Sequence, residues 1–447
     1  MILILSNNQE PAPISRPPVP VKSRPVTKPQ TALASLLPHH PGMQMPTRHL
    51  VALALLLAMQ NASAAGSTAA ARQLAQDALI VDTHIDAPSE LQSEWKELGQ
   101  LTPSREFDYP RAREGGLDVA FMSIYTSSEE DRLGTARQIA HTQIDSVEAM
   151  VGRHPDKFAL LTSPGDVERL RAGNRVLLAL GMENGAPLVD DLAQLAQFHS
   201  RGVRYITLAH SASNRISDSS YDANRQWQGL SPFGKDVVAE MNRLGIMVDV
   251  SHLSDAATLQ AVNLSRVPVI ASHSGLRHFT PGFERNLSDE LAQAIAAKGG
   301  VVQIVFGIGF VNPQAATDVQ AWFTARAALN ARNAAAAQAG KPLEDAAAFE
   351  SEWDRTHPTP ATPIEAVLDQ IDYAVKLIGV DHVGIGSDFD GVSGMLPEGL
   401  RNVADYPNLI SGLQARGYKD DDLKKILGGN LLRVWAAVEA GSEKPKR

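Results

Sequence analysis

Seven residues of the kinds that bind metal ions or transfer protons follow apolar, strand-like stretches of the sequence. They are His84, Asp86, Glu183, His210, His252, His273 and Asp388. The chain of 447 residues contains no cysteine, so any metal ion must be held by imidazole and carboxylate groups. Such groups hold catalytic zinc, which lowers the pKa of a bound water towards about 7. The set therefore predicts metal-assisted hydrolysis without a protein nucleophile.

The spacing of five of these residues predicts two neighbouring metal ions. His84 and Asp86 are separated by one residue, so their side chains point to the same side at the end of an extended strand. His252 and His273 end two successive later strands and form a second pair. Glu183, in GMENG, would bridge two ions with one oxygen to each. An isolated H-x-D pair is more often a capped turn, so the prediction depends on the complete set.

Three further side chains are expected to act on the substrate. Asp388, in GIGSDFDG (384–391), is the expected proton-transfer group, with Asp390 as its competitor. His210 is expected to donate to the substrate carbonyl oxygen as negative charge develops there, although a core histidine is the alternative. Arg285 follows the sixth strand-like run and is expected to bind a free carboxylate through two N–H donors, the alternative being a solvated loop arginine.

The elements that must position these residues alternate in type along the chain. Apolar runs of strand character alternate with stretches of helical period, which is typical of a parallel sheet wrapped by helices. The eight runs cover residues 78–84, 118–125, 175–182, 203–210, 246–252, 267–273, 301–306 and 382–388. Eight βα units close into a (β/α)8 TIM barrel, whose active site lies at the carboxyl ends of the strands. We therefore expect an α/β fold with all seven residues at one mouth.

One domain is expected to carry this barrel, over residues 66–440, followed by a flexible tail over 441–447. Stretches of helical period cover residues 135–150, 233–245 and 363–379. The alanine-rich segment from about 312 to 360 is longer than one crossover requires and predicts a helical insertion.

The N-terminal sequence predicts export to the periplasm or the medium. Residues 1–42 are rich in proline, contain no aromatic residue and are expected to be a disordered leader. Residues 43–65 contain, in order, basic residues, the apolar run LVALALLLAM and the small residues NASAA, which is typical of a signal peptide. A buried helix is the alternative, and translation starting at Met43 or Met45 stays open. The run is too short to span a bilayer, so we expect no transmembrane anchor in the mature chain.

The charge balance argues against nucleic acid as a partner. Acidic residues number 50 against 41 basic ones, which gives a formal net charge of −9. The sequence has no stripe of lysine and arginine that would neutralise a phosphate backbone.

Several longer motifs resemble the membrane (renal) dipeptidase family of binuclear zinc hydrolases. The similarity runs from about residue 79 to 436. It is carried by VDTHIDAP (81–88), REGGLDVAFMSIY (113–125), GMENG (181–185), GVRYITLAHSASN (202–214), GLSPFGKDVVAEMNRLGIMVDVSHLSD (229–255), VPVIASHS (267–274), RNLSDE (285–290) and VGIGSDFDG (383–391). YPNLI (406–410) and GGNLLRVW (428–435) are also similar to that family.

The resemblance implies a role for each candidate residue. It implies two zinc ions per chain, one bound by His84 and Asp86, one by His252 and His273, with Glu183 between them. It further implies that Asp388 transfers protons, His210 contacts the substrate and Arg285 meets its terminal carboxylate. Family members cleave dipeptides, often with a D-residue at the carboxyl side, some open β-lactam rings, and homodimers are common among them. The chain departs from the family at Asn184, where many relatives have glycine, and at residues 303–310, which lack the polar residues of mammalian members.

Two competing interpretations stay open at this stage. Another binuclear barrel amidohydrolase or lactonase would usually carry H-x-H on its first strand and a carboxylated lysine, whereas this chain has Asp86 and no lysine at a strand end. A non-catalytic exported zinc- or peptide-binding protein would not need Asp388.

Overall fold

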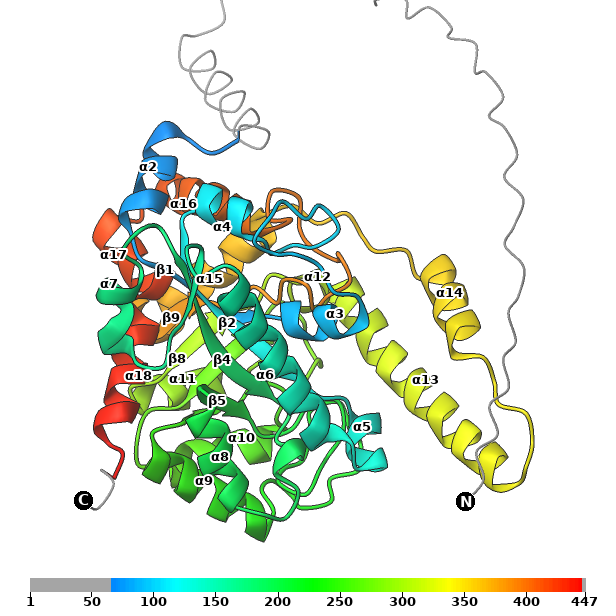
Figure 1. Cartoon of the computed structure of the whole chain (residues 1–447). Helices are drawn as coiled ribbons and strands as arrows, with labels where there is room; N and C mark the ends of the chain where they lie inside the picture. The colour runs from blue at the N-terminus through cyan, green and yellow to red at the C-terminus, as the bar shows by residue number, and fades with distance from the viewer. Residues whose placement is uncertain (1–65, 444–447) are drawn as a thin grey trace, which may run out of the picture. The chain divides into compact units, whose positions relative to one another are not determined.

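Eight parallel strands form the barrel wall in the order β1-β2-β4-β5-β6-β7-β8-β9, which confirms the predicted TIM barrel (Figure 1). Their bounds are β1 Ile80–Ile85, β2 Leu117–Tyr125, β4 Val176–Glu183, β5 Val203–Thr207, β6 Met247–Asp249, β7 Ile270–Ser274, β8 Val301–Ile304 and β9 Val383–Ile385. The computed structural model describes residues 66–443. The predicted leader (1–42), the signal peptide (43–65) and residues 444–447 of the predicted tail lie outside the described residues.

The barrel closes where the segment after β9 meets the end of β1. Ile85 forms a parallel bridge with Phe389. The Asp86 N–H donates to the Phe389 carbonyl at 2.8 Å, and the Asp388 N–H donates to the His84 carbonyl at 3.1 Å. This closure brings the first and the last candidate residues of the chain side by side.

Helices surround the wall, apart from the two of the insertion described below, which lie beside it (Figure 1). They are α2 Ala69–Asp77, α3 Ala87–Ser93, α4 Tyr109–Gly115, α5 Ser128–Leu133, α6 Ala136–Arg153, α7 Val167–Leu170, α8 Ala193–Ser200, α9 Pro232–Leu244, α10 Asp255–Leu264, α11 Asp289–Ala297, α12 Ile308–Val311, α13 Pro313–Gln338, α14 Ala346–Thr356, α15 Glu365–Ile378, α16 Tyr406–Ala415, α17 Asp420–Lys424 and α18 Asn430–Ala440. The three predicted helices are α6, α9 and α15. In α9 the Ser231 side chain caps the first turn, Pro232 opens the helix and Gly245 ends it at φ 80°.

Side chains alternate between the barrel interior and the helices, as the period of a strand requires. On β4, Leu177 and Ala179 belong to the interior cluster. Leu178 and Leu180 belong to the outer cluster, which also contains the buried faces of the surrounding helices. The interior register continues to Glu183 at the carboxyl end of the strand, so the fold itself carries this carboxylate to the mouth of the barrel.

Two features lie outside the regular barrel pattern. The short strand β3 (Phe158–Leu160) pairs with β4 off the main path and was not predicted, since three residues give no clear periodic signal. The expected insertion is α13 with α14, drawn beside the barrel in Figure 1. It is tied to the body through Phe323, whose ring stacks on Tyr221 at 4.0 Å between centroids. None of the helices within residues 66–443 has the length and apolarity needed to cross a bilayer.

Candidate metal centre

The two oxygens of Glu183 face two different groups of histidines. Oε2 lies 3.3 Å from His84 Nε2. Oε1 lies 3.0 Å from His252 Nε2 and 3.3 Å from His273 Nε2. A carboxylate with one oxygen towards each of two ligand groups has the geometry of a bridge between two ions. The strand ends of β1, β4 and β7, together with the segment after β6, therefore bring the predicted residues to one place.

Asp86 and Asp388 complete the side of the centre at His84. Asp86 Oδ2 lies 3.4 Å from His84 Nε2. The ligand atoms of His84, Asp86 and Asp388 all lie within 4.8 Å of one another. Gly391 makes room for both carboxylates, because a Cβ there would lie 2.3 Å from Asp86 Oδ2 and 2.4 Å from Asp388 Oδ1. The glycines of the GIGSDFDG turn thus allow the close approach that the sequence predicted.

The donor atoms are so close that they also form other sets of three. His84, Glu183 and His273 form one such set, and Glu183, His210 and His252 form another. The Nε2 atoms of His252 and His273 are 2.9 Å apart. All three sets share His84 or Glu183, so they describe one continuous centre. The division into His84–Asp86 and His252–His273 stays a prediction; Glu183 Oε2 lies near His84, and Oε1 lies near His252 and His273.

The backbone is strained at two of these residues. His252 has φ 68° and Asp388 has φ 67°. Such left-handed conformations cost of order 1–3 kcal/mol each and persist where the surrounding structure imposes them. The left-handed conformation at His252 forms a turn after β6, and this turn places His252 at the barrel mouth.

Burial sets the protonation states that a metal ligand needs. It lowers the pKa of His252 and of His273 well below the usual range of histidine. For Glu183, burial alone would raise the pKa, but the histidines around it, His84, His210, His252 and His273, together outweigh burial and hold the pKa well below its usual range. Neutral imidazoles and an ionised carboxylate are the forms that bind metal ions.

The surroundings of His84 favour a positive charge at this point. Burial lowers the pKa of His84, but Tyr205, Glu183 and Asp86 outweigh it and raise the pKa well above the usual range. His84 Nε2 is buried without a hydrogen-bond partner. An unpartnered nitrogen facing carboxylates fits a divalent cation. The residues present therefore fit the metal that the sequence predicted.

His210 and Arg285 also lie at the mouth. His210 Nε2 is 3.5 Å from Glu183 Oε1, and the ring is tilted against His252 at 4.1 Å between centroids. Arg285 is 2 % exposed and donates to the Ser274 hydroxyl and the His273 carbonyl, while its Nε is buried without a partner. His210 thus lies at the centre, and Arg285 is buried and not solvated. Their roles towards a substrate stay predictions.

Comparison with known proteins assigns the family. A family model described as membrane dipeptidase, peptidase family M19, matches residues 68–447. The chain belongs to this membrane dipeptidase family. As a member of it, the chain is a hydrolase of the metallo-dipeptidase class.

Individual relatives agree with this membership. Dipeptidase aclJ from Aspergillus oryzae is 33% identical over 341 residues, which are 75% of this chain and 70% of that protein. Dipeptidase 3 from Mus musculus is 30% identical over 381 residues, which are 83% of this chain and 66% of that protein. The crystal structure of the probable dipeptidase PvdM from Pseudomonas aeruginosa is 30% identical, has a TM-score of 0.72 and covers 83% of this chain and 98% of its own.

Buried hydroxyl groups fix the orientation of two histidines in this membrane dipeptidase and were missed by sequence reasoning. The Tyr205 hydroxyl donates to the Thr83 carbonyl at 3.0 Å, so its oxygen accepts from His84 Nδ1 at 2.8 Å. The Ser272 hydroxyl donates to Asp249 at 2.6 Å and accepts from His273 Nδ1 at 2.8 Å. In their neutral forms, both imidazoles would then present an unprotonated Nε2 to the centre.

Tyr205→Phe is expected to weaken metal binding by about 10–100-fold, because His84 loses the partner that fixes its tautomer. Titration with zinc in the presence of a competing chelator measures this affinity. Tyr373→Phe is the matched control, because its hydroxyl bonds to Asp289 on the outer surface. An unchanged zinc affinity in folded Tyr205→Phe protein would show that the hydroxyl has no such role.

Asn184 stands where many relatives have glycine, and it keeps the turn that follows Glu183. Asn184 has φ 78°, a conformation that glycine adopts freely and asparagine tolerates better than most residues. Its Nδ2 donates to the Thr126 carbonyl at 2.9 Å, and its Oδ1 accepts from the Ala186 N–H at 3.2 Å. In residues 303–310, the other segment that departs from the family, the Phe310 ring lies against Arg285, with 5.1 Å between the ring centroid and the guanidinium carbon.

Asn184→Ala is expected to lower the free energy of unfolding by about 1 kcal/mol more than Asn184→Gly. Both variants lose the amide hydrogen bonds, but only alanine places a Cβ in the left-handed region. Urea denaturation of the two variants measures the difference. Equal stability of the two would contradict a conformational explanation of this position.

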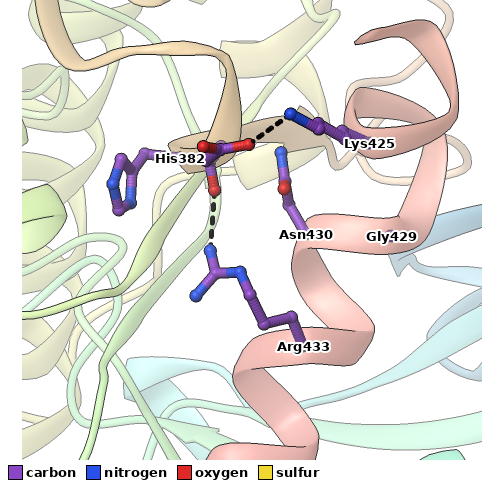
Figure 2. Close-up of a pocket in the computed structure, with 6 residues that line it drawn as sticks. His382, Lys425, Gly429, Asn430 and Arg433 are labelled. Atoms are coloured by element: carbon purple, nitrogen blue, oxygen red, sulfur yellow. Dashed lines mark hydrogen bonds and ion pairs between the residues drawn. The ribbon is translucent and has the colours of Figure 1, made fainter. Parts of the chain in front are cut away.

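One hollow lies at the other end of the barrel, and an ion pair and hydrogen bonds connect the side chains that line it. It has a volume of about 530 Å³ and is lined by residues around the N-terminal end of β9 and on the segment that leads into α18 (Figure 2). Lys425 pairs with Asp381 at 2.8 Å, and Arg433 donates to the Asp381 carbonyl at 2.6 Å. Asn430 donates to the Val380 and Val383 carbonyls. These side chains hold α18 against β9 and contribute nothing to the metal centre.

Proposed function

We propose that this membrane dipeptidase hydrolyses the peptide bond of dipeptides with two zinc ions. In this proposal His84 and Asp86 hold one ion, His252 and His273 hold the other, and Glu183 bridges them. The single observation that carries the proposal is the position of Glu183, with Oε2 at 3.3 Å from His84 Nε2 and Oε1 at 3.0 Å from His252 Nε2.

Bound zinc would polarise the scissile carbonyl and lower the pKa of a water molecule, so that the water becomes a nucleophile near neutral pH. Asp388 then accepts the proton of the attacking water and passes it to the leaving amine. His210 donates a hydrogen bond to the oxygen on which negative charge develops. Arg285 binds the terminal carboxylate through N–H groups that are not used by Ser274 and His273.

Asp388, rather than its competitor Asp390, is assigned the proton-transfer role. Asp390 accepts hydrogen bonds from the backbone N–H of Glu106 at 2.7 Å and of Phe107 at 3.3 Å. Both hydrogen bonds hold the loop at Glu106 and Phe107, so the Asp390 carboxylate already has a structural role. Asp388 lies with His84 and Asp86 instead.

A substrate panel tests the proposed reaction. The zinc-loaded protein is expected to cleave L,L and L,D dipeptides with a free carboxyl terminus and to cleave their C-terminal amides at least about tenfold more slowly, since Arg285 loses a charged partner. Chelation should abolish both activities. Hydrolysis of lactones but of no dipeptide would favour a lactonase, and zinc binding without any turnover would favour a binding protein.

We also propose that the chain is exported and forms a homodimer. The order of basic, apolar and small residues before Ala65 supports export. The homodimer rests on family resemblance alone. N-terminal sequencing of the mature protein and light scattering test the two proposals. A mature chain that begins well before Ala65 would rule out export by this route.

A further inference from the structure

A second, smaller pocket lies beside the metal centre and is lined by polar side chains. Its volume is about 300 Å³, and it lies between α3, the end of β2, α5 and α6. Its lining includes Tyr125, Glu130 and Gln143. Within residues 66–443, no lysine or arginine lines the pocket, and Glu130 is the one formally charged residue of its lining.

Tyr125 joins this pocket to the metal centre. Tyr125 pairs in register with Glu183 across β2 and β4, so the two residues lie at the same level of the barrel. The Tyr125 ring also meets the His210 ring edge to face, with centroids 4.7 Å apart. On the other wall, the Ser89 hydroxyl donates to the Asp86 carbonyl at 2.9 Å. Tyr125 and Ser89 therefore each contact both the pocket lining and a residue of the centre.

Gln143 leaves a buried acceptor unused at this pocket. Gln143 is 2 % exposed, and its Nε2 donates to the Tyr125 carbonyl at 2.8 Å and to Gln92 Oε1 at 2.9 Å. Because a carbonyl can only accept, these bonds fix which end of the amide is nitrogen. Gln143 Oε1 has no hydrogen-bond partner. An unsatisfied buried acceptor costs about 1–3 kcal/mol. Because this oxygen is buried, a ligand donor would recover that cost once a side chain of the pocket lining moves aside.

The pocket lies across the barrel mouth from Arg285. In the strand order, β2 and β7 are separated by three strands in one direction and by β8, β9 and β1 in the other, so they face each other. Arg285 lies on the loop after β7. A dipeptide whose carboxylate binds Arg285 therefore directs its N-terminal residue towards β2 and the pocket.

From these contacts we infer that the pocket receives the side chain of the N-terminal substrate residue and selects side chains that carry hydrogen-bond donors, cationic ones above all. Gln143 Oε1 accepts from the donor, and the Glu130 carboxylate adds attraction for a positive charge. The inference rests on the proposed dipeptide hydrolysis and adds the substrate class of one subsite. Acidic N-terminal side chains are disfavoured.

Three matched substrates test the inference. Lysyl-alanine carries a donor, norleucyl-alanine has the same chain without the ammonium group, and glycyl-alanine has no side chain and serves as the reference. The wild-type protein is expected to show a kcat/KM for lysyl-alanine about tenfold above that for norleucyl-alanine. Gln143→Leu should reduce this ratio by about 3–10-fold with glycyl-alanine little affected.

Two further variants separate specificity from folding. Glu130→Gln can keep the capping box in which the side chain accepts from the Ser127 N–H, yet it should also reduce the lysine preference. Gln194→Leu is the control, because Gln194 on α8 is another buried glutamine with an unpartnered Oε1 and does not line the pocket. Its substrate ratio should match that of the wild type.

Each outcome has a distinct meaning. No wild-type preference for lysyl-alanine, or an unchanged ratio in Gln143→Leu and Glu130→Gln, would overturn the inference and leave the pocket with water only. If glycyl-alanine and both longer substrates stay uncleaved by zinc-loaded wild-type protein, the proposed dipeptide hydrolysis itself fails. A ratio that falls in both pocket variants, but not in Gln194→Leu, supports the inference.

Discussion

Asp388→Asn is expected to lower kcat for dipeptide hydrolysis by about 10²–10⁴-fold while the bound metal stays at the wild-type level. Asparagine has nearly the same shape but cannot accept the proton of the attacking water. It also tolerates the left-handed backbone that Asp388 adopts at φ 67°, so the turn should keep its conformation. Steady-state kinetics with metal analysis of the same preparation measure both quantities.

Asp390→Asn is the matched control for this prediction. Asp390 is two residues away, has φ 63° and uses its carboxylate to accept the Glu106 and Phe107 N–H groups. Asp390→Asn should lower the free energy of unfolding and leave kcat close to the wild-type value. Full activity in Asp388→Asn, or a far larger loss of kcat in Asp390→Asn with intact metal content, would contradict the assignment of the proton-transfer group.

Glu183→Gln has the second large expected effect, the loss of at least one metal ion per chain and a fall in kcat/KM of at least about 10³-fold. The amide removes the negative charge that faces both histidine groups and offers only one oxygen in place of two. Metal analysis after exhaustive dialysis, followed by kinetics with added zinc, measures the effect.

Asp118→Asn is the control for the loss of a buried carboxylate. Asp118 lies at the start of β2, at the opposite end of the barrel wall from the metal centre, and accepts from the Ile80 N–H at 3.1 Å. This variant should bind metal like the wild-type protein. Wild-type metal content in Glu183→Gln would show that Glu183 does not bridge.

The barrel was predictable because apolar runs and helical periods repeat along the chain, but the extent of each strand was not. The run 246–252 contains only three strand residues, Met247–Asp249. Beyond them the chain turns, and His252 adopts its left-handed conformation. An apolar run indicates that a segment is buried, whereas strand pairing depends on neighbours that are distant in sequence. The same limit explains why β3 was missed.

The candidate ligands were predictable because each lies at the carboxyl end of a strand and is a histidine or an acidic residue. Few structural roles require such residues at that end of a barrel. Their supporting residues were not. Tyr205 reaches His84 across 121 residues of sequence, through the space left by Gly181, where a Cβ would lie 1.9 Å from the Tyr205 ring. Hydroxyl groups are common on strands, and the sequence does not say which of them meet. A weak signal existed for Asp249, a charged residue within a strand buried at every position.

The zinc content of the purified wild-type protein tests the central claim most directly. A centre bridged by Glu183 predicts two zinc ions per chain, with dipeptide hydrolysis that is lost when they are removed and regained when they are restored. A chain that binds no more than one zinc at saturation, or that cleaves dipeptides equally well without metal, would contradict it.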